Sequence, residues 1–380
     1  MRSSKTLTPL LLVAIIFLTN VTASAALSAC IDEHNRFVLN GKPFFPLGLY
    51  VVQSLTDTNE LDEIANSPFD TLMNYNVNSG TDAQITQYLN ELESRKLKLI
   101  FSLKEYVGHG HQDIDTISHK VKTFGSHPSI ISWYLNDELS PKHLLELEVR
   151  YEKVRELDAN HPVWSVHWNR NWLVKEGHTT DIVGVDPYPI DNNPITLVSQ
   201  MADAARKVGK PLWLVPQVFS WQDYPADFRA VTGRPPTRDE MRAMTYLAVN
   251  HGAKGLIYYS YFNIRDDKDY GTRWQQIKEI GEEIDTLRLV FLSSFPTNDG
   301  DIECTDTNID FQLMREGDTY YLFAVNTKKI AISDTLFRVN LIKAPSTIDT
   351  MFEGDRRIPV SNGGFRDHFT PYEVHVYRWR

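Results

Sequence analysis

Short apolar runs alternate with amphipathic stretches over most of this chain. The runs are nearly continuous in apolar residues, which is typical of parallel strands covered on both faces. They lie at residues 44–51, 71–76, 97–103, 130–135, 162–168, 182–185, 212–215 and 255–261. The stretches between them, such as 83–96 and 274–289, carry apolar residues at helical spacing. Eight strand–helix units within residues 44–294 predict an α/β fold of the (β/α)8, or TIM, barrel type rather than a doubly wound sheet.

The segments on either side of the predicted barrel have a different pattern. Residues 26–43 contain two short apolar runs around Asn40-Gly41, which predicts a β-hairpin. After Ser294, short alternating runs are separated by Gly, Asn and Asp turns such as Gly363-Gly364. Residues 295–380 are therefore expected to form a small antiparallel β-sandwich.

Residues 1–25 have the form of a secretory signal peptide. Arg2 and Lys5 supply a positive start, residues 10–18 an apolar stretch, and Ala23-Ser24-Ala25 a cleavage site. We therefore expect a secreted or periplasmic protein. A lipoprotein is the alternative, with a lipid anchor at Cys30, because residues 27–30 (LSAC) resemble a lipobox; the polar-leaning residues 19–26 argue against it. No apolar segment is long enough to predict a membrane span.

Charge and cysteine content narrow the choice of partners. The formal charge of −10 leaves no basic stripe to neutralise phosphates, so a nucleic-acid partner is not expected. The only two cysteines, Cys30 and Cys304, would form a single disulfide in an oxidising compartment. Buried free thiols, or a lipidated Cys30 with Cys304 alone, are the alternatives.

Candidate chemistry follows the apolar runs, because the active site of such a barrel lies at the C-terminal ends of its strands. The polar and aromatic residues there combine carboxylates, amides and rings, as expected for a site that binds a sugar. They are Tyr50, Asn76, Glu105, Asn136, Asp137, Glu138, His167, Trp168, Asp186, Tyr188, Gln217, Trp221 and Tyr259. Some have structural alternatives: Asp186 could hold its loop, and Glu105 could pair with Lys104.

The acidic pair in SWYLNDELSP, residues 132–141, is the most informative of these. Helix capping does not explain Asp137 and Glu138, because Ser140 and Pro141 already supply an N-cap and a proline at the first helical position. The segment HGHQD at 109–113 has two histidines, but this spacing alone is weak evidence for a metal site. We therefore expect no metal and no cofactor.

Four segments together resemble clan-A-type glycoside hydrolase barrels: FFPLGLY, ISWYLNDELSP, DIVGVDPYP and AKGLIYYSY. The resemblance covers residues 37–293, and a C-terminal β-sandwich is usual in such enzymes. It implies hydrolysis of glycosidic bonds in an oligosaccharide or polysaccharide, with the general acid/base at the end of strand four. That position is Glu138. The adjacent carboxylate of Asp137 would raise its pKa, as a general acid requires.

This chain departs from the family at strand seven, where the resemblance places a nucleophilic glutamate. The segment PLWLVPQVFSW has Gln217 there, and an amide cannot form a glycosyl-enzyme ester. Three interpretations remain. In the first, the Asp137–Glu138 pair resembles that of substrate-assisted β-hexosaminidases, with a 2-acetamido group as nucleophile and Gln217 and Tyr188 holding the sugar. In the second, the enzyme inverts, with Asp186 or Glu105 as base. In the third, the barrel binds glycans without cleaving them.

Overall fold

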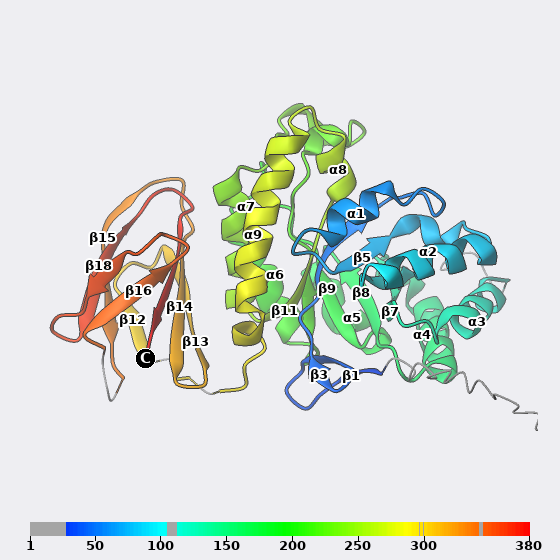
Figure 1. The fold of residues 1–380 in the computed structure, drawn as a ribbon, viewed down its shortest axis with the longest axis horizontal. Helices are drawn as coiled ribbons and strands as arrows, with labels where there is room; N and C mark the ends of the chain where they lie inside the picture. The colour runs from blue at the N-terminus through cyan, green and yellow to red at the C-terminus, as the bar shows by residue number, and fades with distance from the viewer. Residues whose placement is uncertain (1–27, 105–111, 296, 299, 342–344) are drawn as a thin grey trace, which may run out of the picture.

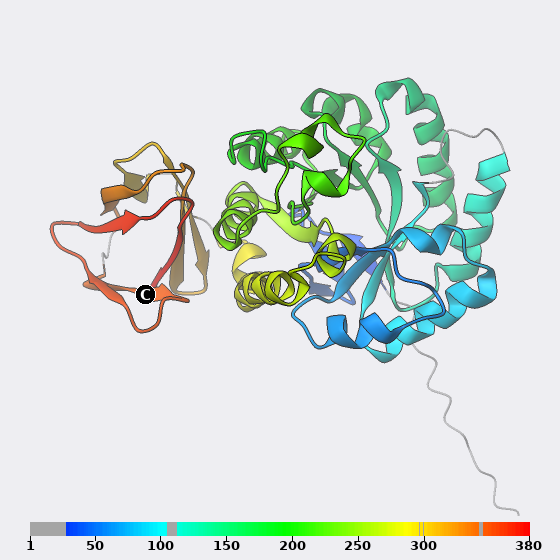
Figure 2. The same cartoon turned by 90° about the horizontal axis from the view of Figure 1, so that it is seen from above.

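The computed structural model describes residues 28–104, 112–295, 297–298, 300–341 and 345–380. Its centre is a closed barrel of eight parallel strands, completed where β11 pairs with β4 (Figures 1 and 2). In order around the barrel the strands are β4 (Leu47–Val51), β5 (Thr71–Asn74), β6 (Lys98–Ser102), β7 (Ile130–Asp137), β8 (Val163–His167), β9 (Ile182–Val185), β10 (Leu212–Leu214) and β11 (Ala253–Tyr258). The predicted TIM barrel is confirmed.

Helices surround the barrel, as Figure 2 shows from above. The α-helices are α1 (Asn59–Ala65), α2 (Asp82–Ser94), α3 (Gln112–Phe124), α4 (Leu144–Leu157), α5 (Arg170–Glu176), α6 (Leu197–Arg206), α7 (Arg238–Asn250), α8 (Tyr261–Arg265) and α9 (Tyr270–Phe291). Short 3-10 turns are η1 (Tyr75–Asn78), η3 (Pro141–His143), η4 (Gly177–Thr179), η5 (Trp221–Asp223) and η6 (Phe228–Val231). Capping boxes begin two of the helices, with Thr81 before α2 and Thr237 before α7. In the described part of the chain, no helix is long and apolar enough to cross a membrane.

Large side chains fill the inside of the barrel, so it is a packed core and not a pore. The rings of Trp164 and Trp213, for example, lie 5.8 Å apart. A small sheet of β1 (Ala29–Ile31), β2 (Phe37–Leu39) and β3 (Lys42–Pro43) covers the N-terminal end, where Phe37 packs edge-on against Trp213 at 5.3 Å (Figure 1). Because this small sheet closes the N-terminal end of the barrel, the barrel is open at the end where its strands have their C-termini.

The C-terminal region forms two packed antiparallel sheets, which confirms the predicted β-sandwich. One sheet has the order β12-β15-β18 and the other β13-β14-β19-β16-β17. Their strands are β12 (Ile302–Cys304), β13 (Ile309–Glu316), β14 (Thr319–Asn326), β15 (Ile332–Val339), β16 (Thr347–Met351), β17 (Arg357–Pro359), β18 (Gly364–Phe369) and β19 (Val374–Trp379). Cys30 in β1 and Cys304 in β12 are both free thiols, so the expected disulfide is not formed.

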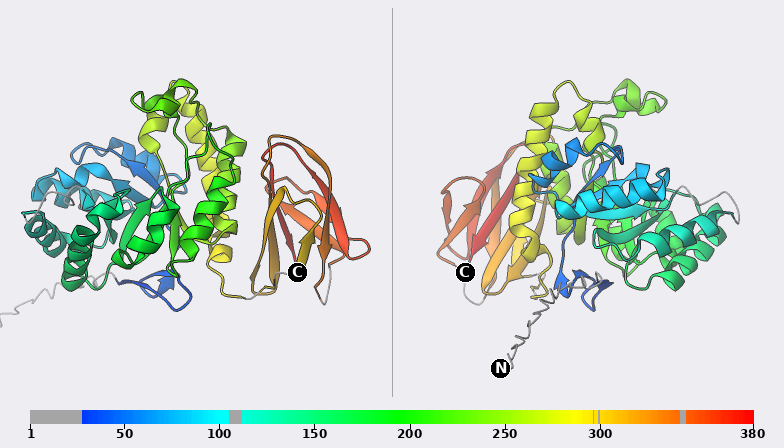
Figure 3. Two further views of the ribbon diagram at one scale, coloured as in Figure 1. Left: turned by 180° about the vertical axis from the view of Figure 1, so that it is seen from behind. Right: turned by 45° about the vertical axis from the view of Figure 1, so that its right-hand side comes forward.

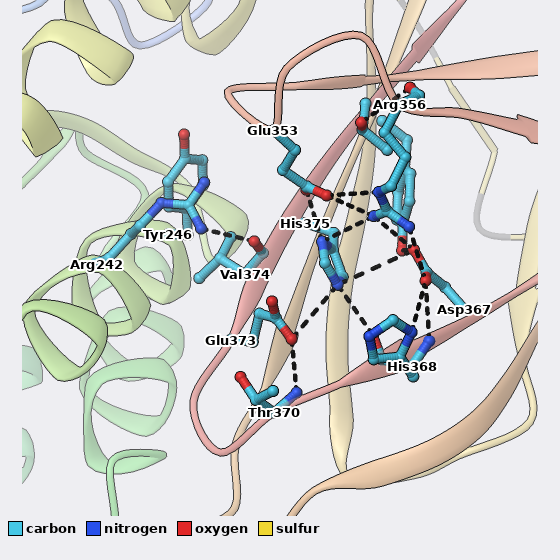
Figure 4. Close-up of polar contacts among 12 residues, drawn as sticks. Arg242, Tyr246, Glu353, Arg356, Asp367, His368, Thr370, Glu373, Val374 and His375 are labelled. Carbon is cyan, nitrogen blue, oxygen red and sulfur yellow. Dashed lines mark hydrogen bonds and ion pairs between the residues drawn. The ribbon is translucent and has the colours of Figure 1, made fainter.

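The sandwich packs against helices α7 and α9 of the barrel (Figures 1 and 3). Phe323 of β14 lies 5.9 Å from the ring of Tyr246 and 5.3 Å from that of Phe291, within one hydrophobic cluster that continues from the barrel. Arg242 of α7 donates a hydrogen bond to the carbonyl of Val374 at 2.6 Å (Figure 4). Beside this contact, a network around His375 ties the loop after β16 to β18 and β19 (Figure 4). The two regions therefore share a core.

Candidate active site

A cavity of about 850 Å³ opens at the C-terminal ends of the barrel strands. Its size is typical of a small-molecule site. Of the residues predicted from the strand ends, eight line it: Tyr50, Asp137, Glu138, Trp168, Asp186, Tyr188, Trp221 and Tyr259. Most of the residues that were chosen because they follow an apolar run therefore lie together in one cavity.

Two carboxyl groups from different strands meet in this cavity. Glu138 follows β7 and is exposed, whereas Asp186 follows β9 and is only 5% exposed. The two side chains are in hydrogen-bond contact. Burial raises the pKa of Asp186 well above its usual range, and the negative charges of Glu138 and Asp137 raise it further. Two carboxyl groups in contact do not both ionise readily, so the pair keeps one proton more easily than two separate groups would, and the raised pKa of Asp186 makes Asp186 the member that holds it.

The backbone at Glu138 is bent to make this contact. Glu138 has φ of +61°, in the left-handed region, which costs about 1–3 kcal/mol for a residue other than glycine. Two hydrogen bonds hold the turn: the Glu138 N–H donates to the carbonyl of Val166 at 3.0 Å, and the Leu139 N–H donates to Asn136 Oδ1 at 3.0 Å. Strain of this kind is often found at functional sites, where neighbouring structure fixes it.

Asp137 has a different environment from its neighbour. The Tyr134 hydroxyl donates to Asp137 Oδ1 at 2.5 Å, and Lys104 forms an ion pair with Oδ2. The same ammonium group lies 4.1 Å from the centre of the Tyr75 ring. Asp137 is thus anchored in the cavity wall by partners on both carboxylate oxygens, and the catalytic role predicted for it stays a prediction.

A β-bulge explains why Asn136 does not reach the cavity. The register between β7 and β8 shifts between Tyr134 and Asn136, so one extra residue stands on β7. Tyr134 and Asp137 therefore both face inward, while Leu135 and Asn136 face the surrounding helices. Asn136 donates to Glu176 of α5 at 3.3 Å instead of contacting a ligand.

Three further predicted residues, His167, Asn76 and Gln217, also lie outside the cavity lining. His167 is 1% exposed and faces Glu176 behind the barrel wall, with Nδ1 3.1 Å from Oε2. Asn76 donates to the carbonyls of Val52 and Gln53. These side chains are structural, and their assignment to sugar binding is corrected. Glu105 lies outside the described residues.

Gln217 is the most consequential of these corrections. Its side chain is fully buried, accepts a hydrogen bond from the Ile190 N–H at 2.8 Å and donates to the Ile190 carbonyl at 2.6 Å. It donates also to the carbonyl of Phe219 at 3.2 Å. The side-chain amide of Gln217 thus has its hydrogen-bond partners within the protein. It joins the loop after β9 to the segment after β10, the seventh strand of the barrel, instead of holding a sugar.

Aromatic rings form much of the cavity surface. Tyr188 and Tyr259 lie 5.7 Å apart, and Phe219 and Trp221 pack edge-on beside them. Trp168 is different, because 53% of it is exposed at the outer wall. Amphipathic rings of this kind present flat apolar faces together with polar edges, which suits the apolar faces of sugar rings.

Further residues complete the lining. Asn169 and Pro187 directly follow predicted strand-end residues, and the strand-end rule included them. The rule missed Tyr75, Arg170, Asn171, Asn193, Leu197, Gln200, Met201, Phe219, Tyr224, Asp227, Phe228 and Arg229. The aromatic density of residues 219–224 was an available signal for part of this set. The others lie in η1, α5, α6, η6 and the connecting loops. Among the residues that the structure describes, no three His, Cys, Asp or Glu side chains come together as metal ligands would.

The fold and the carboxyl pair place this chain among (β/α)8 barrels with a C-terminal β-domain. No family model matches the sequence, and no curated protein matches it. Solved structures share its fold, and glycoside hydrolases are among them. A family 5 glycoside hydrolase from Bacteroides vulgatus has a TM-score of 0.60 at 12% identity, covering 92% of this chain and 93% of that one. A β-galactosidase from Bacillus circulans sp. alkalophilus has a TM-score of 0.63 at 9% identity, covering 88% and 99%.

An α-amylase from Geobacillus thermoleovorans, complexed with acarbose, gives a TM-score of 0.59 at 11% identity. The alignment covers 88% of this chain and 98% of the amylase. At such identities the likeness establishes the shared fold, barrel and C-terminal β-domain together.

Proposed function

We propose that this protein is a glycoside hydrolase acting on an oligosaccharide or polysaccharide through Glu138 and Asp186. The observation that carries the proposal is the contact between these two carboxyl groups inside an aromatic-lined cavity. Glycosidases need two such groups, one to protonate the leaving oxygen and one on the other side of the reacting carbon. The resemblance of the strand-end motifs and the glycoside hydrolases among the structural neighbours support the same reaction class.

The positions of the two groups suggest their division of labour. Glu138 is the exposed member at the wall, where the departing sugar leaves, and it is the general acid that delivers the proton to the glycosidic oxygen. Asp186, at the buried floor, has the raised pKa, so it must pass its proton to Glu138 when the sugar binds before it can act as the carboxylate. Inverting enzymes hold their carboxyl groups roughly 6.5–9.5 Å apart to admit a water molecule. Enzymes that act by double displacement hold the two groups only about 5–5.5 Å apart. Glu138 and Asp186 are nearer to this spacing than to that of inverting enzymes, so we favour double displacement, with the bound sugar separating the two groups.

In that sequence, an Asp186 carboxylate oxygen bonds to the anomeric carbon while the bond to the leaving oxygen breaks. The leaving oxygen takes the proton from Glu138 and departs as an alcohol. Water then attacks the anomeric carbon and gives its proton to the Glu138 carboxylate, and the bond to Asp186 breaks. The pair ends with the one proton with which it began.

Two observations weigh against a substrate-assisted reaction on 2-acetamido sugars. Asp137, which would orient the acetamido group, is held by Lys104 and Tyr134. Gln217, which would hold the sugar, is sequestered by Ile190. A substrate panel distinguishes the mechanisms directly.

The test is hydrolysis of aryl glycosides, with and without a 2-acetamido group, and of polysaccharides. Glu138→Gln and Asp186→Asn should each lower turnover by about 10²- to 10⁴-fold, whereas Glu152→Gln, on the exposed side of α4, should not. Wild-type turnover in either carboxyl variant would exclude that residue. Cleavage restricted to 2-acetamido glycosides would favour substrate assistance, and saturable glycan binding without products would favour a binding barrel. The first-formed anomer, followed by NMR, separates retention from inversion.

We also propose that the protein is exported, secreted or periplasmic, under the direction of residues 1–25. The positive start, apolar stretch and small-residue cleavage site support this proposal. A lipid anchor at Cys30 is the alternative, and in that case the mature chain would begin at Cys30 and lack Ala29.

A further inference from the structure

Among the charged side chains that line the active-site cavity, Arg170 stands apart. Arg229 is held by Asp227 at 2.7 and 2.5 Å and stacks on Trp221, with its guanidinium carbon 3.2 Å from the ring centre. Asp137 is neutralised by Lys104, and the carboxyl pair keeps one proton. Arg170 is exposed, and no residue of the described part forms a hydrogen bond or ion pair with its guanidinium.

The surroundings of Arg170 are those of a sugar-binding wall. The consecutive residues from Trp168 to Asn171 all line the cavity, so that an exposed indole ring, two amides and a guanidinium lie side by side. The ring offers a flat apolar face, the amides offer hydrogen bonds to hydroxyl groups, and the guanidinium offers a fork that fits a carboxylate or sulfate.

A second cavity, of about 340 Å³, lies beside the first and is lined by residues of the barrel and of the sandwich. The two cavities share Asn193, and the second is bounded on the sandwich side by Lys328 and Lys329, which are exposed. Neither ammonium group has a partner among the described residues. Asp191 also lines this cavity, but it faces Arg234 at 3.9 Å. The Arg170 guanidinium in the first cavity and the two ammonium groups in the second are therefore cations without a carboxylate partner among the described residues, although the first cavity also holds the carboxyl groups of Glu138 and Asp186.

We infer that these two cavities bind an anionic glycan chain, with one acidic sugar at Arg170 and the next part of the chain at Lys328 and Lys329. This inference rests on the proposed function, because it names the substrate class of the same site. The anionic group is a uronate carboxylate or a sulfate ester, and both fit a guanidinium fork. All three cations are exposed to solvent, and an anionic glycan is the class of ligand that would give each of them a charged partner.

The test is direct binding, measured by calorimetry on the Glu138→Gln variant so that no turnover is required. The probes are a uronate oligosaccharide, its carboxyl-reduced neutral counterpart and a sulfated galactan oligosaccharide. We expect at least one anionic probe to bind about tenfold or more tightly than the neutral one, the worth of one charge-assisted hydrogen bond. Arg170→Gln should remove this preference, Arg170→Lys should keep part of it, and Lys328→Gln with Lys329→Gln should weaken only the longer chains.

Lys122→Gln is the matched control, because it removes one exposed positive charge from α3, away from both cavities. Equal affinity for the anionic and neutral probes would overturn the inference, as would an anionic preference that survives when Arg170→Gln, Lys328→Gln and Lys329→Gln are combined. Either result leaves the proposed hydrolysis standing, since that is judged by turnover. Conversely, charge-dependent binding by a protein without turnover on any glycoside would support this inference and refute the proposed function.

Discussion

The side chain of Gln217 is closed on the backbone of Ile190, which donates to its Oε1 at 2.8 Å and accepts from its Nε2 at 2.6 Å. A glutamate in this place would face two carbonyl oxygens with no hydrogen to donate, unless it took up a proton. We therefore expect Gln217→Glu to lower the free energy of unfolding by about 2–4 kcal/mol and not to increase hydrolysis. Urea denaturation measures the first effect, and aryl glycoside turnover the second.

Gln222→Glu makes the same change at an exposed position and should leave stability within about 0.5 kcal/mol of the wild type. If Gln217→Glu were stable and more active, the carboxylate would have reached the sugar, and the assignment of Asp186 as the second group would be wrong.

Asp186 should limit stability while it supports catalysis. Its raised pKa means that folding favours the protonated form, so its stabilising contribution is complete below its ordinary pKa of 3.8 and is lost as pH rises towards the pKa in the folded protein. Asp186→Asn keeps the shape without the charge. It should abolish hydrolysis and raise the free energy of unfolding above neutral pH by about 1–2 kcal/mol. Denaturation at several pH values measures this gain, which should vanish near pH 4; a gain independent of pH would refute the argument.

Much of the fold follows from apolar periodicity, but the inward or outward direction of each strand-end residue does not. Parallel strands bury both faces, so alternation gives no clue to which residues point into the barrel. On β8, Trp164 and Val166 face inward, and His167 therefore turns outward to Glu176. The apolar run is equally compatible with His167 pointing into the barrel and with His167 pointing away from it.

The β-bulge on β7 is a second reason why the sequence does not show which side chains face the cavity. One extra residue between Tyr134 and Asn136 changes which side chains face the cavity. The strand-end rule could find the position of Asp137 and Glu138, because the carboxyl ends of barrel strands share one rim. It named Asp186 and Glu105 as candidate second carboxylates for Glu138, but it could not choose between them or find that Glu138 contacts Asp186, because this contact depends on a left-handed turn and on a residue from two strands away.

The site of leader cleavage should be visible in the mature protein. Ala29 is 3% exposed in the barrel floor, and its N–H donates to the carbonyl of Asn160 at 3.1 Å. Cleavage after Ala25 keeps this residue, whereas lipoprotein processing would begin the chain at Cys30 and remove it. We expect the intact mass of the exported protein to correspond to a chain that starts at Ala26. A mass corresponding to a diacylated Cys30 would establish the lipid anchor instead.

His251 should make the junction between barrel and sandwich sensitive to pH. Burial lowers its pKa, but Asp310 of β13 and Asp203 of α6, at 2.7 and 2.8 Å, outweigh this and raise the pKa to about 9. The raised pKa stabilises the fold fully below about pH 6.5, and this contribution is lost as pH rises through about 9. The free energy of unfolding should fall by about 2 kcal/mol across this window. His251→Gln should flatten the curve; an unchanged slope would show that other groups cause it.

The sandwich should be required for the barrel to fold. Helix α7 is buried along most of its length, because Tyr246 packs on Phe323 and Arg242 reaches Val374. Removing residues 295–380 would expose this apolar surface and leave the Arg242–Glu283 ion pair open to water. We therefore expect residues 26–294 alone to aggregate or to bind a hydrophobic dye, whereas residues 26–380 should not. A monomeric, cooperatively unfolding barrel of residues 26–294 would show instead that the sandwich is an independent module.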